Sequence, residues 1–271
     1  MRRILFYLLA VLIGFSLIGY AGALQAPKVV RYSVVLPNWP AGAPPLRIVQ
    51  LSDLHGSWLD MPPRRISRIV AQVNALHPDL VVMTGDYVGG KLFDWPQIRL
   101  ENFSDRLGHL RARYGVFAVV GNHDTRQWTR WAFDRVGIRL LIDQIADAGP
   151  VTLAGVDDVT NVVNPAVSVR DLGTRIPVGK PVVLLAHEPD YFQYLPDNID
   201  LLIAGHTHGG QIKLPLIGTR SLGPFLDAHL RGSFVEHGQR MVVSSGLGTS
   251  ILPMRIGVRP EIVEITLSGP V

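Results

Sequence analysis

Residues 199–208 read IDLLIAGHTH, an apolar run that ends in two histidines separated by one residue. The run predicts a buried strand over residues 199–204, followed by His206 and His208. Side chains at positions i and i+2 of an extended chain share one face, so two imidazoles at this spacing can converge on one metal ion. A hydrogen-bonded surface pair is the alternative, and other motifs are needed to choose between the two.

Four earlier apolar runs also end in residues that ligate metals or transfer protons. The runs and the residues that follow them are 46–51 with Asp53 and His55, 80–83 with Asp86, 116–120 with Asn122, His123 and Asp124, and 181–186 with His187. Ligands of α/β sheets bind beyond the carboxyl ends of the strands, so these side chains can meet in one crevice. The sequence therefore predicts a single site that gathers five strand ends.

Each of these residues also has an ordinary structural interpretation. Asp53 can cap a turn, Asn122 can adopt left-handed backbone, and the turn at Pro189 can account for His187. The distribution of the nine histidines favours the single site, because five of them follow predicted strands. The remaining four lie in predicted helices or loops and are expected at the surface: His77, His109, His229 and His237.

The order of the apolar patterns predicts an α/β domain. In the first half, helices are expected from Ile66 to Leu76, within residues 96–113 and around residues 126–136. The second half is richer in strands, expected over 151–155, 181–186, 199–204, 241–245 and 261–267 with few helices between them. Layered sheets are therefore expected, and residues 213–231, with several Gly and Pro, are expected to form an excursion loop.

Residues 1–27 are expected to form a membrane anchor. Arg2 and Arg3 precede an uncharged run from Ile4 to Ala26, and about 20 such residues suffice for a helix to cross a bilayer. A cleaved signal sequence is the alternative, because residues 21–23 resemble a small-residue cleavage site. The length of the run favours an anchor that is retained.

Residues 28–45 contain four prolines and are expected to be a linker and lead-in, with the globular domain over residues 46–271. Lys28 and Arg31 nearly balance Arg2 and Arg3 across the apolar run, so an extracytoplasmic domain is only slightly favoured and the cytoplasmic face stays open. The net charge of +4 identifies no partner by itself, and nothing in the sequence sets the oligomeric state.

In order and residue type, the motifs resemble those of the calcineurin-like metallophosphoesterase superfamily. They are Asp53-x-His55, Gly85-Asp86, Gly121-Asn122-His123-Asp124, His187 and Gly205-His206-x-His208. The segment from Ser245 to Glu261 and the apolar amino terminus further resemble the membrane-associated bacterial YkuE/YaeI-like phosphodiesterase branch, which includes a UDP-2,3-diacylglucosamine pyrophosphatase. The resemblance implies a four-layer α/β/β/α sandwich of mixed sheets, preceded by a single transmembrane helix in the bacterial inner membrane.

The resemblance also implies a role for each motif residue. One metal ion would be held by Asp53, His55 and His208, the second by Asn122, His187 and His206, and Asp86 would bridge the two. His123 would be the catalytic histidine, and Asp124 would orient its ring. Nitrogen and oxygen ligands without sulfur suit two divalent ions such as Mn, Zn, Fe or Co, and the sequence does not choose among them.

A dinuclear centre with a bridging hydroxide hydrolyses phosphoric esters. We therefore expect a phosphodiesterase or pyrophosphatase that acts on a membrane or envelope substrate, such as UDP-2,3-diacylglucosamine of lipid A biosynthesis. One alternative is a nuclease or general phosphodiesterase of the same fold, although no dedicated nucleic-acid motif is present. Another is a membrane-tethered metal-binding protein without activity. His123 argues against that last alternative, because a pure metal binder needs no histidine that is not a ligand.

Several residues beside the motifs have no assigned role. Arg64, Arg65 and Arg68 open the first predicted helix and are expected to form a solvated basic face. Arg255 lies in a loop that resembles a family segment approaching the site, so a surface position and a site position are equally open for it. Trp58 and Leu59 are expected either to shape an apolar substrate wall or to pack on the first helix.

Overall fold

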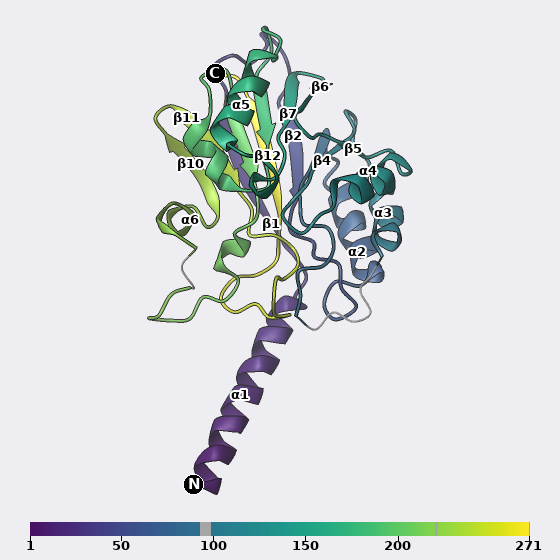
Figure 1. The fold of residues 1–271 in the computed structure, drawn as a ribbon. Coiled ribbons are helices and arrows are strands. Elements are labelled where there is room, and N and C mark those ends of the chain that lie inside the picture. Colours follow the sequence, from purple (N-terminus) through teal and green to yellow (C-terminus); the bar gives the residue numbers. More distant parts are fainter. Residues whose placement is uncertain (93–98, 220–221, 271) are drawn as a thin grey trace.

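A computed structural model describes residues 1–92, 99–219 and 222–270 of the chain. Two mixed sheets of six strands each form the body, helices cover it on two sides, and α1 (Arg2–Ala23) projects from one end (Figure 1). The first half of the body contains β1 (Lys28–Val35), β2 (Leu46–Leu51), α2 (Pro63–Asn74), β3 (Leu80–Thr84), α3 (Leu100–Leu107), β4 (Val116–Val119), α4 (Arg126–Asp134) and β5 (Arg139–Leu140).

The second half contains more strands, as the sequence predicts. Its elements are β6 (Gln144–Ala148), β7 (Val151–Gly155), η1 (Val159–Asn161), α5 (Pro165–Thr174), β8 (Val182–Leu185), η2 (Pro189–Tyr194), β9 (Leu201–Ala204), η3 (His208–Gly210), α6 (Pro224–Ala228), β10 (Gly232–Glu236), β11 (Gln239–Val243) and β12 (Glu261–Ser268). The helix expected within 96–113 is α3, and residues 96–98 lie outside the described residues. Helix α5 was not predicted from the sequence, although its start is marked by Asn164, whose side chain accepts a hydrogen bond from Ala166 N–H.

The sheets are built around parallel strands with antiparallel partners near their edges. The strand order is β1-β12-β2-β3-β4-β5 in the first sheet and β10-β11-β9-β8-β7-β6 in the second. Strands β2 to β5 run parallel in one sheet, and β7, β8, β9 and β11 run parallel in the other. Parallel strands that are covered on both faces need continuous apolar sequences, which is why these strands show little alternation.

Three hydrophobic clusters define four layers. The central cluster fills the space between the sheets and includes Ile48 and Val82 of the first sheet and Leu185 and Ile203 of the second. A second cluster packs α2, α3 and α4 on the outer face of the first sheet, and a third packs α5 and η2 on the outer face of the second. The expected α/β/β/α sandwich is confirmed.

Residues 28–35, which were expected in the linker, form a strand of the first sheet instead. β1 pairs in parallel with β12 over eight residue pairs, from Lys28–Glu261 to Val35–Ser268. Val34 of β1 and Leu36, the residue after the strand, are buried between the sheets. Leu36 N–H donates to Ser268 O at 2.9 Å. The prolines that suggested a linker are confined to residues 37–45, beyond this strand.

Two residues that were expected at the surface are buried. The ring of His229 packs against Phe225 and Phe234, and its Nε2 lies 2.8 Å from Glu236 Oε1. Arg65 was expected on a solvated basic face, yet it donates to Ala23 O at 2.8 Å and to Gln25 O at 2.9 Å at the end of α1. The periodicity of α2 could not reveal this contact, because its partners lie at the end of α1, a separate segment of the chain.

The burial of Leu36 yields a test of the lead-in segment. The Leu36→Ala variant should lower the free energy of unfolding by about 2–5 kcal/mol, because it leaves a cavity between the sheets. The matched control is Val35→Ala, since the neighbouring Val35 side chain is 48% exposed and should change stability by less than about 0.5 kcal/mol. Equal unfolding curves for the two variants in detergent would show that residues 28–36 do not belong to the core.

Candidate metal centre

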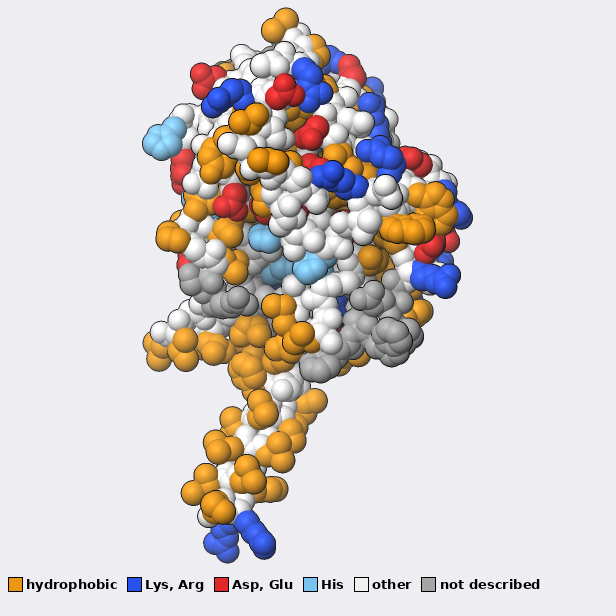
Figure 2. Space-filling model, in the orientation of Figure 1, with side chains coloured by type: hydrophobic (Ala, Val, Ile, Leu, Met, Phe, Trp, Pro, Cys, Tyr) orange, Lys and Arg blue, Asp and Glu red, His pale blue; other side chains and the backbone are white. Residues whose placement is uncertain are grey.

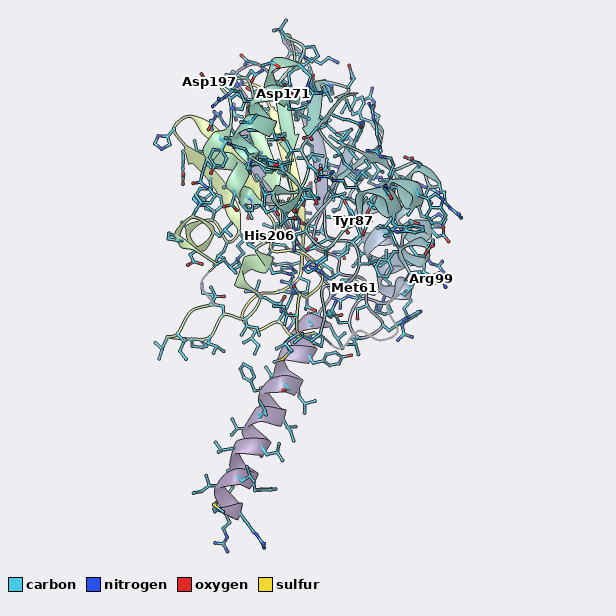
Figure 3. All side chains as sticks on the ribbon, viewed as in Figure 1. Met61, Tyr87, Arg99, Asp171, Asp197 and His206 are labelled. Carbon is cyan, nitrogen blue, oxygen red and sulfur yellow. The ribbon has the colours of Figure 1, made fainter. Side chains whose placement is uncertain are left out.

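The strand ends that carry the predicted site residues meet at one end of the sandwich. β2, β3 and β4 bring residues from the first sheet, and β8 and β9 bring residues from the second. His206 follows β9 and lies in the half of the body nearer to α1 (Figure 3). All seven predicted ligands take part in the contacts described below, so the structure brings the complete set together.

The first group consists of Asp53, His55 and His208, whose ligand atoms all lie within 4.8 Å of one another. His55 Nε2 and His208 Nε2 are 3.1 Å apart, and His208 Nε2 is 3.5 Å from Asp53 Oδ1. All three side chains are buried. This is the set that the resemblance assigns to one ion.

The second group surrounds Asn122 Oδ1. His187 Nε2 lies 3.0 Å from this oxygen, and His206 Nδ1 lies 3.2 Å from it. The two histidine nitrogens are themselves 3.1 Å apart. Asn122 from the first sheet and the two histidines from the second thus direct three ligand atoms toward one point beside the first group.

Asp86 lies between the two groups. Its Oδ2 is 3.2 Å from His55 Nε2 and 3.4 Å from His187 Nε2. Its Oδ1 accepts the backbone N–H of His123 at 2.9 Å. Burial raises the pKa of Asp86, but the charges of His187 and His55 outweigh this effect and hold the pKa well below its usual range. The carboxylate is therefore ionised and can reach both groups.

The protonation pattern of the imidazoles fits a bound cation. His55 Nδ1 faces Gly89 O at 2.9 Å, and His187 Nδ1 faces Thr84 O at 2.7 Å, so each Nδ1 donates its proton to a carbonyl. The Nε2 atoms of both rings therefore face Asp86 Oδ2, where either a proton or a metal ion can bind them. Burial lowers the pKa of His206 to about 4, which keeps that ring neutral. The pKa of His187 is raised well above its usual value, because the charge of Asp86 outweighs the effect of burial, so this nitrogen holds a positive charge unless a metal ion replaces the proton.

The backbone of the site is held in an unusual conformation. Five predicted ligands have positive φ angles, and they are Asp53 at 51°, His55 at 43°, Asp86 at 57°, His206 at 70° and His208 at 52°. Non-glycine residues adopt this region rarely, and it is concentrated at functional sites where the surrounding structure enforces it. The fold therefore stabilises a costly local geometry that turns each side chain into the centre.

A buried chain of polar side chains joins the two sheets behind Asp53. Gln50 Nε2 donates to Ala204 O at 2.8 Å across the sheets and to Thr84 Oγ1 at 2.9 Å. Thr84 Oγ1 then donates to Ser52 Oγ at 2.7 Å, and Ser52 Oγ donates to Asp53 Oδ2 at 2.6 Å. These hydrogen-bonded side chains were not predicted from the sequence. The signal was a glutamine inside the apolar strand β2, where an unpartnered polar group would be costly.

His123 is exposed at the edge of the centre, and its ring centroid lies 5.2 Å from that of His55. Asp124 was expected to orient the His123 ring, but its carboxylate binds backbone amides instead. Oδ2 accepts from Asp86 N at 2.7 Å and Gly121 N at 2.9 Å, and Oδ1 accepts from Tyr87 N at 2.9 Å. Burial and the neighbouring Asp86 raise the pKa of Asp124 to about 7. Asp124 thus fixes the loops that carry His123 and Asp86.

Arg255, whose position the sequence left open, is fully buried behind the first group. Its guanidinium donates to Ser245 O at 2.8 Å, and it approaches His208 O and His208 Nδ1 at 3.4 Å each. Glu188 was not singled out from the sequence, although it directly follows His187. Its carboxyl group is buried within ligand distance of His187 and His206. A charged residue adjacent to a predicted ligand was the available signal.

A cleft of about 640 Å³ opens above the metal centre. His123, Asn122 and Asp86 form part of its polar floor. Its walls are apolar and come from two loops, with Ile212, Leu214, Ile217 and Leu222 from one and Ile251 and Leu252 from the other. Trp58 borders a different hollow, with Pro62 and His109, and therefore does not shape this wall.

The four-layer sandwich, the two convergent groups of metal ligands and the cleft above them are the features of a metal-dependent phosphoesterase. The calcineurin-like phosphoesterase family matches residues 46–210, the part of the chain that contributes every predicted ligand. The chain belongs to this family, and it is a metallophosphoesterase.

Similar proteins occur in bacteria and vertebrates. YkuE of Bacillus subtilis, a metallophosphoesterase, is 30% identical over 93% of this chain and 90% of its own length. The phosphodiesterase YaeI of Escherichia coli is 30% identical over 83% of each chain. A transmembrane protein with a metallophosphoesterase domain from Danio rerio is 34% identical over 92% of this chain, which spans 59% of that relative.

The close approach of the two sheets at Gly205 yields a prediction. A Cβ atom there would lie 1.9 Å from Ser52 Oγ and 2.6 Å from Asp53 Oδ2, so Gly205→Ala must displace Asp53. We expect a loss of bound metal and a fall in unfolding free energy of about 1–3 kcal/mol, the usual cost of overpacking. Gly14→Ala is the control, because a Cβ at Gly14 meets nothing within 4 Å. Wild-type metal content in Gly205→Ala would contradict this geometry.

Proposed function

We propose that the protein is a membrane-anchored phosphodiesterase or pyrophosphatase with a dinuclear metal centre, acting on an amphiphilic phosphoester. The observation that carries the proposal is the pair of ligand groups with Asp86 between them, at the floor of a cleft with apolar walls. Asp53, His55 and His208 would hold one ion. Asn122, His187 and His206 would hold the other. Asp86 would bind both.

Two divalent ions at such a centre supply a nucleophile at neutral pH and offset the charge of the phosphoryl oxygens. The residues of this chain orient and balance that chemistry. Asp53 and Asp86 contribute two negative charges, whereas Asn122 and neutral imidazoles contribute none. A centre with so few carboxylates retains positive charge, which favours an anionic phosphoester in the cleft. An all-carboxylate site would weaken this attraction.

His123 would act as the proton donor to the leaving oxygen. It lies on the cleft floor next to the ligands, and its main chain is fixed by the hydrogen bond from His123 N to Asp86 Oδ1. A positioned histidine is the usual group for this step. Asp124 would support it as a positioning residue, because its carboxylate holds the amides of Gly121, Asp86 and Tyr87.

The apolar walls of the cleft support an amphiphilic substrate. A phosphoester headgroup over the polar floor would leave an attached acyl chain against Leu214, Ile217 and Ile251. Pockets of this composition bind ligands mainly by apolar contact and orient them with a few polar groups. UDP-2,3-diacylglucosamine is one substrate of this kind.

The side of the membrane on which the body lies decides which substrates the proposed enzyme can meet. The apolar helix α1 is long enough to cross a bilayer, and we propose that it anchors the protein once in the bacterial inner membrane. The charges flanking α1 slightly favour an extracytoplasmic body, where nucleotide-sugar lipids made in the cytoplasm are not available. Reporter fusions at the carboxyl terminus distinguish the two orientations, and an external terminus would exclude UDP-2,3-diacylglucosamine.

Two substitutions can distinguish the role of the metal ligands from the role of the proton donor. His123→Ala should retain two ions per chain and lose about 10²- to 10⁴-fold in turnover of an aryl phosphodiester, because only the proton donor is removed. His208→Ala should lose metal as well as activity. Metal content is measured by plasma mass spectrometry, and turnover is measured after stripping the ions and reloading with Mn or Zn. Full turnover in His123→Ala, or activity in the stripped wild type, would refute the mechanism.

The substrate class is tested at the cleft wall. Leu214→Ser should raise KM about tenfold for an acylated phosphodiester, because a polar wall binds the acyl chain less well. KM for a short aryl phosphodiester should not change. Val235→Ser is the control, since Val235 is exposed on β10 and does not line the cleft. A parallel change for both substrates would argue against an acyl-binding wall.

A further inference from the structure

The part of α1 that protrudes from the body is shorter than a bilayer is thick. If α1 crosses a membrane, the body must therefore lie against the membrane surface. The first buried residue of α1 is Gly19, so the protruding apolar part runs from Ile4 to Ile18. At about 1.5 Å per residue this part spans only about 22 Å. The hydrocarbon core of a bilayer is about 30 Å thick. The rest of α1 must therefore lie at membrane depth while it is docked on the body.

The docked end of α1 is fixed to the body by several contacts. Gly19 O accepts the backbone N–H of Arg255 at 2.8 Å, and Tyr20 Oη donates to Leu59 O at 2.7 Å. Ala23 is buried, and a Cβ at Gly22 would lie 2.0 Å from Arg255 O. These contacts hold α1 directly against the loop that carries Arg255. The bilayer surface consequently reaches the end of the body that surrounds α1.

Backbone contacts connect this loop to two others at the same end. Lys213 N–H donates to Ile256 O at 2.8 Å, one residue beyond Arg255, and residues 214–218 then form a tight turn closed by hydrogen bonds between Leu214 and Gly218. Leu92 N–H donates to Ile251 O at 3.1 Å. In Figure 1 the green loop containing this turn extends sideways at the level where α1 meets the body.

The tips of these loops expose large apolar side chains. The exposed fractions are 108% for Leu216, 79% for Ile217, 67% for Leu92 and 46% for Ile251. Figure 2 shows hydrophobic side chains gathered at this base of the body around the exit of the helix, with histidine side chains just above them. We call these four residues the apolar collar. Contiguous exposed apolar groups of this kind mark a contact surface.

We propose that the apolar collar inserts into the same bilayer leaflet that α1 enters, as a second membrane contact of the body. The short protruding helix brings the bilayer to this end, and the collar supplies apolar side chains at the level where the lipid begins. The collar is continuous with the docked end of α1 through residues 254–256 and 212–213. The inference goes beyond the proposed activity and requires only that α1 crosses the membrane.

Insertion of the collar would fix the direction in which the active site opens. Ile217 and Ile251 belong both to the collar and to the wall of the cleft above the metal centre. The mouth of the cleft would therefore lie at the lipid surface. A substrate with an acyl chain could pass from the leaflet to the cleft without leaving an apolar environment.

The natural absence of cysteine makes a direct test possible. Single Leu216→Cys and Ile251→Cys variants of the full chain are spin-labelled in nanodiscs of phosphatidylethanolamine and phosphatidylglycerol. The control is Val178→Cys, because Val178 is fully exposed and precedes β8 at the strand end opposite His187. Leu12→Cys reports independently whether α1 is in the bilayer. Relative access of each label to oxygen and to a water-soluble nickel chelate measures depth.

We expect labels at positions 216 and 251 to be several-fold more accessible to oxygen than to the nickel chelate, as at position 12, and the reverse at position 178. If position 12 lies in lipid but positions 216 and 251 lie in water, the collar proposal is wrong while the anchor and the proposed activity stand. Strong dipolar coupling between labels at position 216 of two chains would assign the collar to a second copy and also overturn the proposal. The depth measurement does not depend on hydrolysis, so failure of the proposed activity is detected separately.

Discussion

The carboxylate of Asp86 holds together ligands that belong to different sheets. One of its oxygens lies 3.2 Å from His55, which follows β2, and 3.4 Å from His187, which follows β8. A buried carboxylate is unfavourable unless it is paired and hydrogen bonded, so the two sheet ends must meet around it. The left-handed backbone at five ligands, Asp86 among them, and the polar chain from Gln50 to Asp53 stabilise the strand ends at this junction.

The apolar helix α1 docks on the same end of the body. Arg255 joins the two features, because its backbone N–H binds Gly19 O of α1 while its guanidinium contacts the loop that carries His208. Burial lowers the pKa of Arg255 only to about 10, so it remains a cation behind the centre. The role of α1 is therefore not confined to a possible membrane span, since its last turns form part of the support beneath a predicted metal ligand.

Much of this architecture could be predicted from the sequence. Continuous apolar runs followed by Asp, Asn or His located the five strand ends, and the structure brings together all seven metal ligands predicted from them. Contacts between distant segments were not predictable. The pairing of β1 with β12 and the contact of Arg65 with Ala23 depend on partners about 230 and 40 residues away, and neither leaves a local pattern. The burial of His229 also required a hydrophobic cluster assembled from separate elements.

The burial of Ala23 has a consequence for processing. Residues 21–23 resemble a site for signal peptidase, but in the folded chain Ala23 is 1% exposed and its carbonyl accepts a hydrogen bond from Arg65. A protease that must draw its substrate into an extended conformation cannot reach this bond once the body has folded. Cleavage after Ala23 would have to precede folding, and it would remove Ala23 O, one of the acceptors of Arg65, and Gly19 O, the acceptor of the Arg255 backbone N–H. Folding of the body thus protects the junction between α1 and the body from cleavage.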